Sequence, residues 1–338
     1  MCNIAGYSGN KQAAPILLEM LRKQEPYDGD VSTGIATIHE GKLYSKKIVG
    51  TVEDFLQKID LNELPGTIGI AHTRPGGDPD LPAVHPNFNP DFTMAIVTNG
   101  TRVTKYQNEW SKAALMLNEN GYNYPIPDND PEKVSNSPKL RIWLVDHYMK
   151  QGDSITAALA KSCDHVYTDN VSVMIHQDTP NSIYALRTTR PMNVILENGE
   201  AYMATTRFAF PETLKNEPVM LPLAYACEIT KEGIRISPDK MQAEPVSEMT
   251  PYTYAEAYKR FEALLKSQRA PLYFDELEFA VGGDMRDLWE GNHTLVQHAR
   301  LVYDMLWQFE QEGRLKKELR VQPRNRVTRR RWYFSLSD

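Results

Sequence analysis

Few cysteines and no long apolar run are the first features of this 338-residue sequence. Its three cysteines, Cys2, Cys163 and Cys227, are too few and too scattered for a disulfide framework. We therefore expect a reducing, cytoplasmic setting, with Cys163 and Cys227 as small core residues. No stretch approaches the roughly 20 apolar residues that span a bilayer, and the N-terminus lacks the pattern of a secretory signal. A membrane partner is not expected.

A strong excess of one charge is also missing. The net charge of −6 argues against wholesale binding of nucleic acid or membranes, although it does not exclude local patches. No Cys/His ligand spacing accompanies His72 and His85, and the Gly-Gly-Asp at 282–284 fits no phosphate-binding loop. We therefore expect neither a metal nor a cofactor.

The hydrophobic pattern predicts a mixed domain over residues 1–240. Strands are expected at 3–8, 35–38, within 66–74, and at 94–98, 171–176, 182–186, 193–196, 200–204, 227–230 and 234–236, and helices at 12–24, 52–59, 140–150 and 155–161. Strands at both ends of this region with helices between them favour a layered α+β fold.

A Pro-containing linker is expected at 241–252, followed by a second domain at 253–338. Helices at 254–267 and 298–312 precede a hairpin at 314–337, a pattern that resembles a winged helix-turn-helix. Residues 314–331 contain nine basic residues and one acid. Such a segment could bind nucleic acid phosphates. Alternatively, its arginines pair with acidic surfaces of the chain itself or of a second subunit.

Cys2 can carry both a thiol and, once Met1 is removed, a free α-amine. An α-amine titrates at about 7.7–8.0, so it can take the proton of the thiol and later pass it to a leaving amine. Nucleophile and base would then belong to one residue. Many unrelated proteins begin with Met-Cys, so an unremarkable terminal residue is the alternative.

Two further segments suit acyl transfer. The strand at 94–98 runs into Asn99-Gly100, which offers an amide side chain and a backbone N–H as donors to an oxyanion. An ordinary hairpin turn is the alternative, since Asn-Gly favours such turns. Arg74 follows the strand at 68–72 and could clamp a substrate carboxylate, or could form a surface ion pair.

The ordered set of these motifs resembles the class II glutamine amidotransferases. The segments are Cys-Asn-Ile-Ala-Gly at 2–6, Tyr-Asp-Gly-Asp-Val-Ser-Thr-Gly at 27–34, Gly-Ile-Ala-His-Thr-Arg at 69–74, Val-Thr-Asn-Gly at 97–100 and Ala-Tyr-Met-Ala-Thr-Thr at 201–206. The nearest match is the glutaminase domain of glucosamine-6-phosphate synthase, and the resemblance covers roughly residues 2–236.

This resemblance implies a four-layer αββα sandwich of the N-terminal-nucleophile hydrolases. It implies Cys2 as nucleophile, Arg74 as clamp for the glutamine α-carboxylate, and Asn99 with Gly100 as oxyanion hole. His72, Thr73 and the aligned Ser137 complete the candidate substrate-binding set.

Several positions depart from the family pattern. Pro75-Gly76-Gly77 follows the arginine, Asp28 stands where an arginine often follows the tyrosine, and Val31-Ser32 replaces the usual Asp-Ser. The acidic residue that should hold the substrate α-amine aligns near Asn136-Ser137. Asp128 and Asp130 are nearby carboxylates that could restore this part of the site.

The leading hypothesis is hydrolysis of glutamine's γ-carboxamide through a Cys2 thioester, which supplies ammonia or a glutamyl group to a separate acceptor reaction. A separate synthase subunit and a homo-oligomer are the expected partners. One alternative is an N-terminal-cysteine hydrolase of another amide, such as a γ-glutamyl conjugate. Another is a degenerate amidotransferase fold that senses a ligand and controls nucleic acid through the basic hairpin.

Overall fold

The structure of the chain is a computed structural model that describes residues 1–75, 84–102, 107–242, 249–289, 296–324 and 327–337. Three expected features lie partly or wholly outside these ranges. They are Gly76-Gly77 after the arginine, residues 243–248 of the linker, and the hairpin tip at 325–326.

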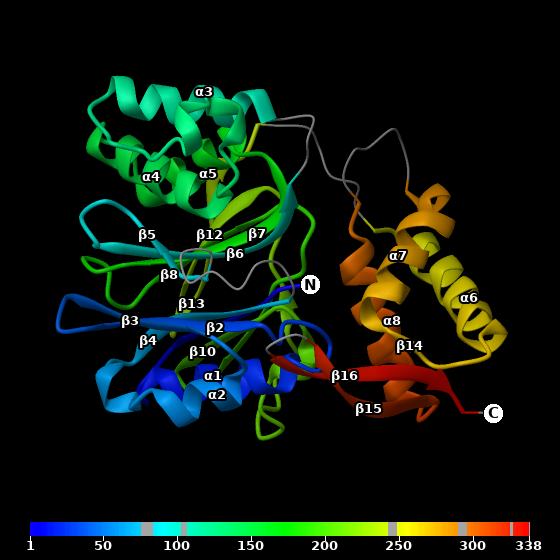
Figure 1. The fold of residues 1–338 in the computed structure, drawn as a ribbon. Helices are drawn as coiled ribbons and strands as arrows, with labels where there is room; N and C mark the ends of the chain where they lie inside the picture. The colour runs from blue at the N-terminus through cyan, green and yellow to red at the C-terminus, as the bar shows by residue number, and fades with distance from the viewer. Residues whose placement is uncertain (76–83, 103–106, 243–248, 290–295, 325–326, 338) are drawn as a thin grey trace.

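The N-terminal region is built from two β-sheets stacked face to face with helices on both outer faces (Figure 1). The first sheet has the order β11-β9-β10-β1-β4-β2-β3, with β1 (Asn3–Ser8), β2 (Ser32–His39), β3 (Lys42–Val49), β4 (Ile68–Arg74), β9 (Asn193–Glu197), β10 (Glu200–Ala204) and β11 (Val219–Met220). The second has the order β13-β12-β8-β7-β6-β5, with β5 (Asn87–Phe88), β6 (Met94–Arg102), β7 (Thr168–His176), β8 (Ile183–Arg187), β12 (Tyr225–Thr230) and β13 (Gly233–Lys240).

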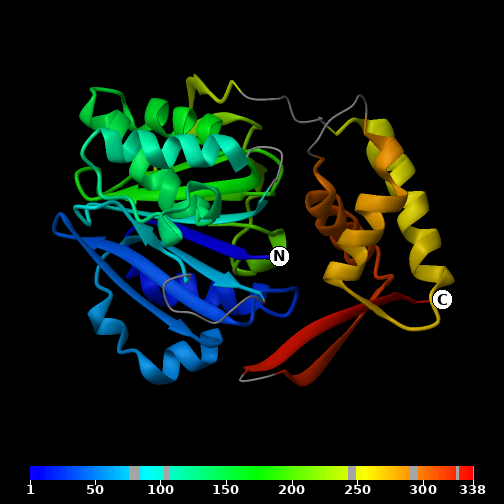
Figure 2. The same ribbon diagram turned by 45° about the horizontal axis from the view of Figure 1, so that its top comes forward.

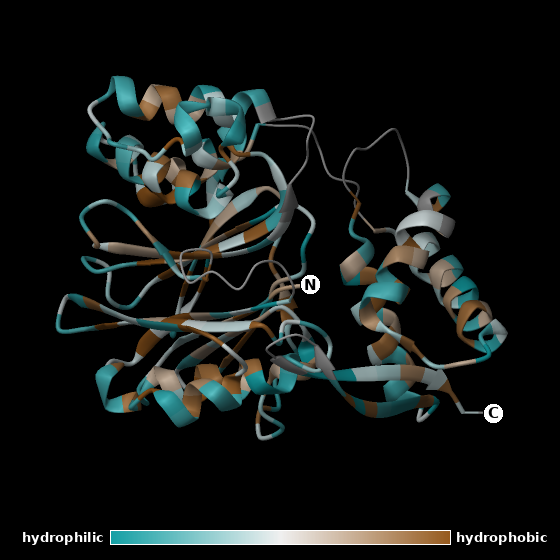
Figure 3. Ribbon diagram, viewed as in Figure 1, coloured by the Kyte–Doolittle hydropathy of each residue, from teal (hydrophilic) through white to brown (hydrophobic). Residues whose placement is uncertain are grey.

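The outer layers are helical. The first sheet is covered by α1 (Ala13–Gln24) and α2 (Val52–Lys58), and the second by α3 (Gln107–Glu119), α4 (Ser137–Lys150) and α5 (Ile155–His165). In Figure 3 these helices carry both hydrophilic and hydrophobic residues, as expected for helices with one buried side. The chain thus forms α, β, β and α layers.

Side chains that alternate between the two faces of a strand contribute to a hydrophobic core on each side of each sheet. In β6, Ala95 and Val97 pack between the sheets, whereas Met94 and Ile96 pack against the α3–α5 layer. Because successive side chains of a strand point to opposite faces, a strand buried on both sides is apolar at nearly every position.

Several elements differ from those expected. The strand expected at 35–38 is the longer β2, which forms a hairpin with β3, and α3 was not expected at all. The strand expected to end at Thr98 continues to Arg102, because residues 98–102 stay paired with β7.

The C-terminal region is a small helical unit with a three-stranded sheet in the order β14-β16-β15. Its elements are α6 (Pro251–Ser267), β14 (Leu272–Tyr273), α7 (Phe274–Asp284), α8 (His298–Gln311), β15 (Leu315–Arg324) and β16 (Val327–Leu336). The α6 and α8 helices and the hairpin were expected, but β14 and α7 were not. Its core is aromatic, with Phe261, Phe274, Phe309 and Phe334 all fully buried.

The C-terminal region packs beside the sandwich, at the end where the N-terminus lies (Figures 1 and 2). The backbone N–H of Trp332 donates to the carbonyl of Pro26 at 2.6 Å, and Tyr27 stacks on Phe334 with ring centroids 5.8 Å apart. Tyr27 thereby joins the core of the C-terminal region. None of the helices in the described ranges is long and apolar enough to cross a membrane.

Candidate functional site

Three strands bring the expected catalytic residues together. Cys2 immediately precedes β1, and the antiparallel register Asn3↔Thr73 sets it beside Arg74 at the end of β4. The second sheet is joined to the first by a hydrogen bond of 3.2 Å between the His72 ring Nε2 and the Thr98 carbonyl. The next two residues of β6, Asn99 and Gly100, line the same cavity as Cys2.

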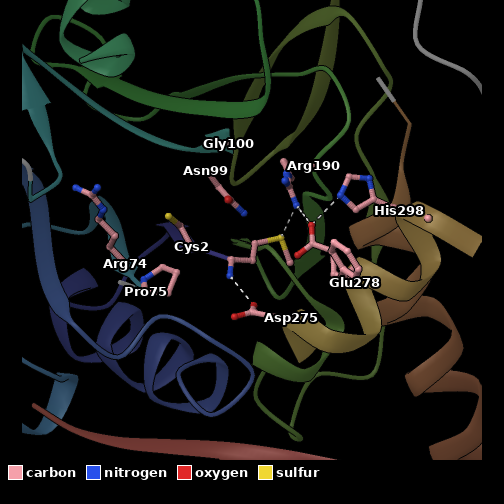
Figure 4. A pocket seen from close by; sticks show the side chains of 13 residues that line it. Cys2, Arg74, Pro75, Asn99, Gly100, Arg190, Asp275, Glu278 and His298 are labelled. Carbon is pink, nitrogen blue, oxygen red and sulfur yellow. Dashed lines mark hydrogen bonds and ion pairs between the residues drawn. The ribbon is translucent and has the colours of Figure 1, made fainter. Parts of the chain in front are cut away.

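A cavity of about 690 Å³ opens at this junction. Figure 4 shows Arg74 on one side of Cys2, Asn99 and Gly100 beside it, and side chains of the C-terminal region on the other side. The lining residues are Met1, Cys2, Arg74, Pro75, Asn99, Gly100, Arg190, Asp275, Glu278, Phe279, Gly282, Gly283 and His298. Both regions of the chain therefore form the site.

Asn99 and Gly100 lie inside β6 and not in a hairpin turn, since they pair with Val171 and Asn170 of β7. The Asn99 side chain is 2% exposed, and its Nδ2 has no hydrogen-bond partner among the described residues. At Gly100, a Cβ atom would collide with the backbone carbonyl of Asp169. A buried amide donor facing the cavity and a glycine forced by close strand packing suit an oxyanion site.

The electrostatic surroundings of Cys2 have opposing effects. Burial raises the pKa of the Cys2 thiol, while the chain's terminal ammonium, Arg74 and Arg190 act in the opposite direction. Burial also lowers the pKa of the Met1 amine. Burial therefore favours the uncharged form of both groups.

The Met1 ammonium occupies an acidic corner of the cavity. It forms an ion pair with Asp28, and it lies 3.6 Å from Asp275 Oδ1 on α7. Arg331 of the hairpin donates to Asp28 Oδ1 at 3.0 Å and lies 3.5 Å from Asp275 Oδ2. Asp28 is one of the departures from the family pattern, and a cation from the C-terminal hairpin compensates its charge.

A second charge network crosses the same interface. Arg190 pairs with Asp169 at 2.6 Å and with Glu278 of α7, and Glu278 also lies 2.9 Å from His298 Nε2. Burial alone would raise the pKa of Glu278, but Arg190 and His298 outweigh it and hold that pKa below its ordinary value. Glu278 is therefore a carboxylate locked between two basic groups.

The other expected substrate-binding residues lie outside the cavity lining. Burial lowers the pKa of His72 to about 3, so its ring is neutral, and Thr73 Oγ1 accepts from Asn3 Nδ2 at 3.1 Å. Ser137 begins α4. Their roles in substrate binding remain predictions.

The carboxylates considered for the amine site are also outside this lining. Asp128 forms an exposed ion pair with Lys133 at 2.8 Å, and Asp130 Oδ1 accepts from the Glu132 backbone N–H at 3.1 Å. Both belong to the short 3-10 turns Pro127–Asn129 and Pro131–Lys133 or adjoin them.

Sequence reasoning missed the wall that the C-terminal region contributes. Asp275, Glu278 and His298 belong to no motif, and Arg190 follows a strand without any special spacing. One signal was present: an unexpected acid at position 28 and a run of arginines at 329–331 are complementary charges. Nothing in the sequence showed that they meet.

Curated relatives match between about three fifths and seven tenths of the chain. Glutamine--fructose-6-phosphate aminotransferase [isomerizing] of Caldanaerobacter subterraneus subsp. tengcongensis is 36% identical over 209 residues, which are 61% of this chain and 31% of that protein. The protein of the same name from Shewanella oneidensis is 30% identical over 235 residues, which are 69% of this chain and 34% of that protein. This chain spans about a third of the length of these relatives. No family model matches the sequence.

Among solved structures, glutamine phosphoribosylpyrophosphate (PRPP) amidotransferase from B. subtilis is similar with a TM-score of 0.59 and 13% identity. The match covers 80% of this chain and 60% of that chain. A likeness at this level of identity concerns the fold.

Proposed function

We propose that this chain, which belongs to the class II glutamine amidotransferases, hydrolyses glutamine's γ-carboxamide through a thioester on Cys2. The observation that carries the proposal is the convergence of Cys2, Arg74 and Asn99-Gly100 on one cavity. These residues come from three strands of two different sheets. Together they supply the groups that amide hydrolysis requires: a nucleophile, a cation for the substrate carboxylate and two donors for the oxyanion.

In the proposed reaction, Arg74 holds the substrate α-carboxylate and directs the γ-amide towards Cys2. The Cys2 sulfur attacks the amide carbon while the Asn99 amide and the Gly100 N–H donate to the developing oxyanion. The Cys2 α-amine accepts the thiol proton and returns it to the departing nitrogen. Water, or an acceptor that takes the glutamyl group, then releases the acyl group from the sulfur.

Removal of Met1 is part of this proposal, because the base is the amine that this cleavage frees. Burial lowers the pKa of the terminal amine in the present structure. A similarly buried Cys2 amine would have its pKa shifted in the same direction, which favours the neutral form that accepts a proton.

We assign the C-terminal elements to a winged-helix-like domain at 253–338 that follows a linker at 241–252, and its first helix, α6, already begins at Pro251. The order of its helices and the hairpin supports this assignment. The hairpin's charges support an internal role: Arg314, Lys317, Arg320, Arg329 and Arg331 all pair with acids of the same chain. These pairs do not favour nucleic acid as its ligand. A separate synthase subunit would receive the ammonia.

Intact mass spectrometry after incubation with 6-diazo-5-oxo-L-norleucine, a glutamine analogue that alkylates such cysteines, tests the proposal. We expect loss of Met1 and one adduct, and no adduct on a Cys2→Ala variant. Loss of Met1 without an adduct would point to a different amide. Retained Met1 would overturn the catalytic role of Cys2.

A further inference from the structure

The side of Cys2 that faces α7 is the side on which an amine must leave. The Cys2 α-amine has to pass its proton to the departing nitrogen, which requires hydrogen-bond distance between the two atoms. In the structure Met1 is attached to that amine and extends towards the C-terminal region, with its sulfur 3.4 Å from Arg190 Nη1. Arg74 lies on the opposite side of Cys2 (Figure 4).

The side chain and the ammonium of Met1 indicate what kind of group this part of the cavity accommodates. Its side chain is an unbranched aliphatic chain, and its ammonium lies between the carboxylates of Asp28 and Asp275. Removal of Met1 takes both away.

The corner that remains is acidic. Asp28 is buried with a side chain 2% exposed, whereas the Asp275 side chain is 42% exposed and faces the cavity. Apart from Met1, Arg331 is the cation within the described ranges that pairs with both of these carboxylates. Glu278 is already held by Arg190 and His298.

We propose that α7 and Asp28 form a second subsite that binds the amine half of a γ-glutamyl amide and selects an aliphatic amine with a second, positively charged amino group. This inference rests on the proposed Cys2 chemistry and specifies its substrate class. The cavity of about 690 Å³ extends on both sides of Cys2, so it can hold a glutamyl group and an amine of this size together.

The reaction balances as an ordinary acyl transfer. The Cys2 sulfur forms a bond to the carbonyl carbon of the γ-amide, the bond from this carbon to the amide nitrogen breaks, and the nitrogen takes the proton that the thiol gave to the α-amine. A diamine leaves. Water then adds to the thioester, glutamate departs, and the thiol regains a proton.

Two synthetic amides of equal length test the subsite. In γ-glutamyl-5-aminopentylamide an ammonium replaces the terminal methyl of γ-glutamyl-hexylamide. We expect kcat/KM to be about tenfold higher for the cationic amide. Equal values, or a preference for the hexyl compound, would overturn the inference, and this comparison needs no variant.

Asp275→Asn should bring the ratio of the two kcat/KM values down about tenfold, towards one. Glu276→Gln is the matched control, because it removes one charge from the same helix at a position outside the cavity lining. The ratio should persist in the control. A ratio unchanged in Asp275→Asn would also overturn the inference.

Labelling of Cys2 by 6-diazo-5-oxo-L-norleucine distinguishes a failure of the amine subsite from a failure of the proposed Cys2 chemistry. If Cys2 is labelled and glutamine is hydrolysed but neither alkyl amide reacts, the amine subsite is wrong while the proposed function stands. If Cys2 is neither labelled nor active on any amide, the proposed function fails, and the subsite fails with it.

Discussion

The cavity at Cys2 has two walls of different origin. The sandwich contributes Arg74, Asn99 and Gly100, which lie at set positions of paired strands. The C-terminal region contributes Asp275, Glu278 and His298, which lie on helices packed from outside. The first wall follows from sheet register. The second depends on how two regions meet, and buried ion pairs join them there.

The two walls should also differ in how a substitution acts. Changes in the sandwich wall should reduce the chemical step, whereas changes at the interface should alter stability or the choice of amine. Substitutions at the nucleophile should therefore have the largest effects and those beside the interface the smallest.

Replacing the nucleophile should have the largest effect. Cys2→Ala should reduce glutamate release from glutamine by at least about 10³-fold, because no other group in the cavity can form the thioester. Cys163→Ala is the control, since this buried cysteine packs in the α3–α5 layer, away from the cavity. Comparable activity of Cys2→Ala and the parent would contradict the mechanism.

Asn99→Ala should reduce kcat by about 10²–10³-fold, with a much smaller change in KM. The reason is that the Asn99 amide donates to an oxyanion that exists only after attack. Steady-state kinetics with glutamine would measure the two constants separately. A rise in KM at constant kcat would instead make Asn99 a ground-state binding residue.

Arg331→Met should lower the free energy of unfolding by about 3 kcal/mol, because the buried Asp28 carboxylate loses its cation from the hairpin. Urea denaturation would measure this change. Arg320→Met is the matched control: its guanidinium pairs with the neighbouring Glu318 and lies over the Tyr333 ring on the exposed part of the same hairpin, so a loss of at most about 1 kcal/mol is expected. Equal effects of the two substitutions would refute an internal role for Arg331.

A smaller effect should appear at Glu25, which lies beside the interface. Burial raises the pKa of Glu25 to about 8, and its Oε1 accepts from the Val52 N–H at 2.7 Å. The folded state therefore binds this proton more tightly than the unfolded state does. The resulting stability is fully present below the unfolded pKa of about 4.3 and is lost as the pH rises through 8.

Glu25→Gln imitates the protonated side chain and keeps the acceptor for Val52. Its Tm should exceed that of the parent by a few degrees at pH 9 and should match it at pH 4. Thermal unfolding at both values would measure the difference. A variant that is less stable than the parent at pH 9 would contradict the raised pKa.

Much of the layered region could be predicted from the sequence. Strands such as β1, β4 and β7 are buried at nearly every position and contain short apolar runs, and α1 and α5 have apolar residues at helical spacing. The helix α3 escaped prediction because its first turn is polar and it follows a strand without a clear boundary. The short β14 and the helix α7 carry too weak a pattern to be recognised locally.

The sequence by itself determined the nucleophile, the clamp and the oxyanion donors as candidates, since each is tied to a strand end or to a backbone position that leaves a local pattern. Only the tertiary structure decided that Arg331 forms an ion pair with Asp28, and that Asp275 and Glu278 line the same cavity as Cys2. Charges that meet across an interface are separated by hundreds of residues in the chain. Their pairing depends on packing, for which the local sequence holds no signal.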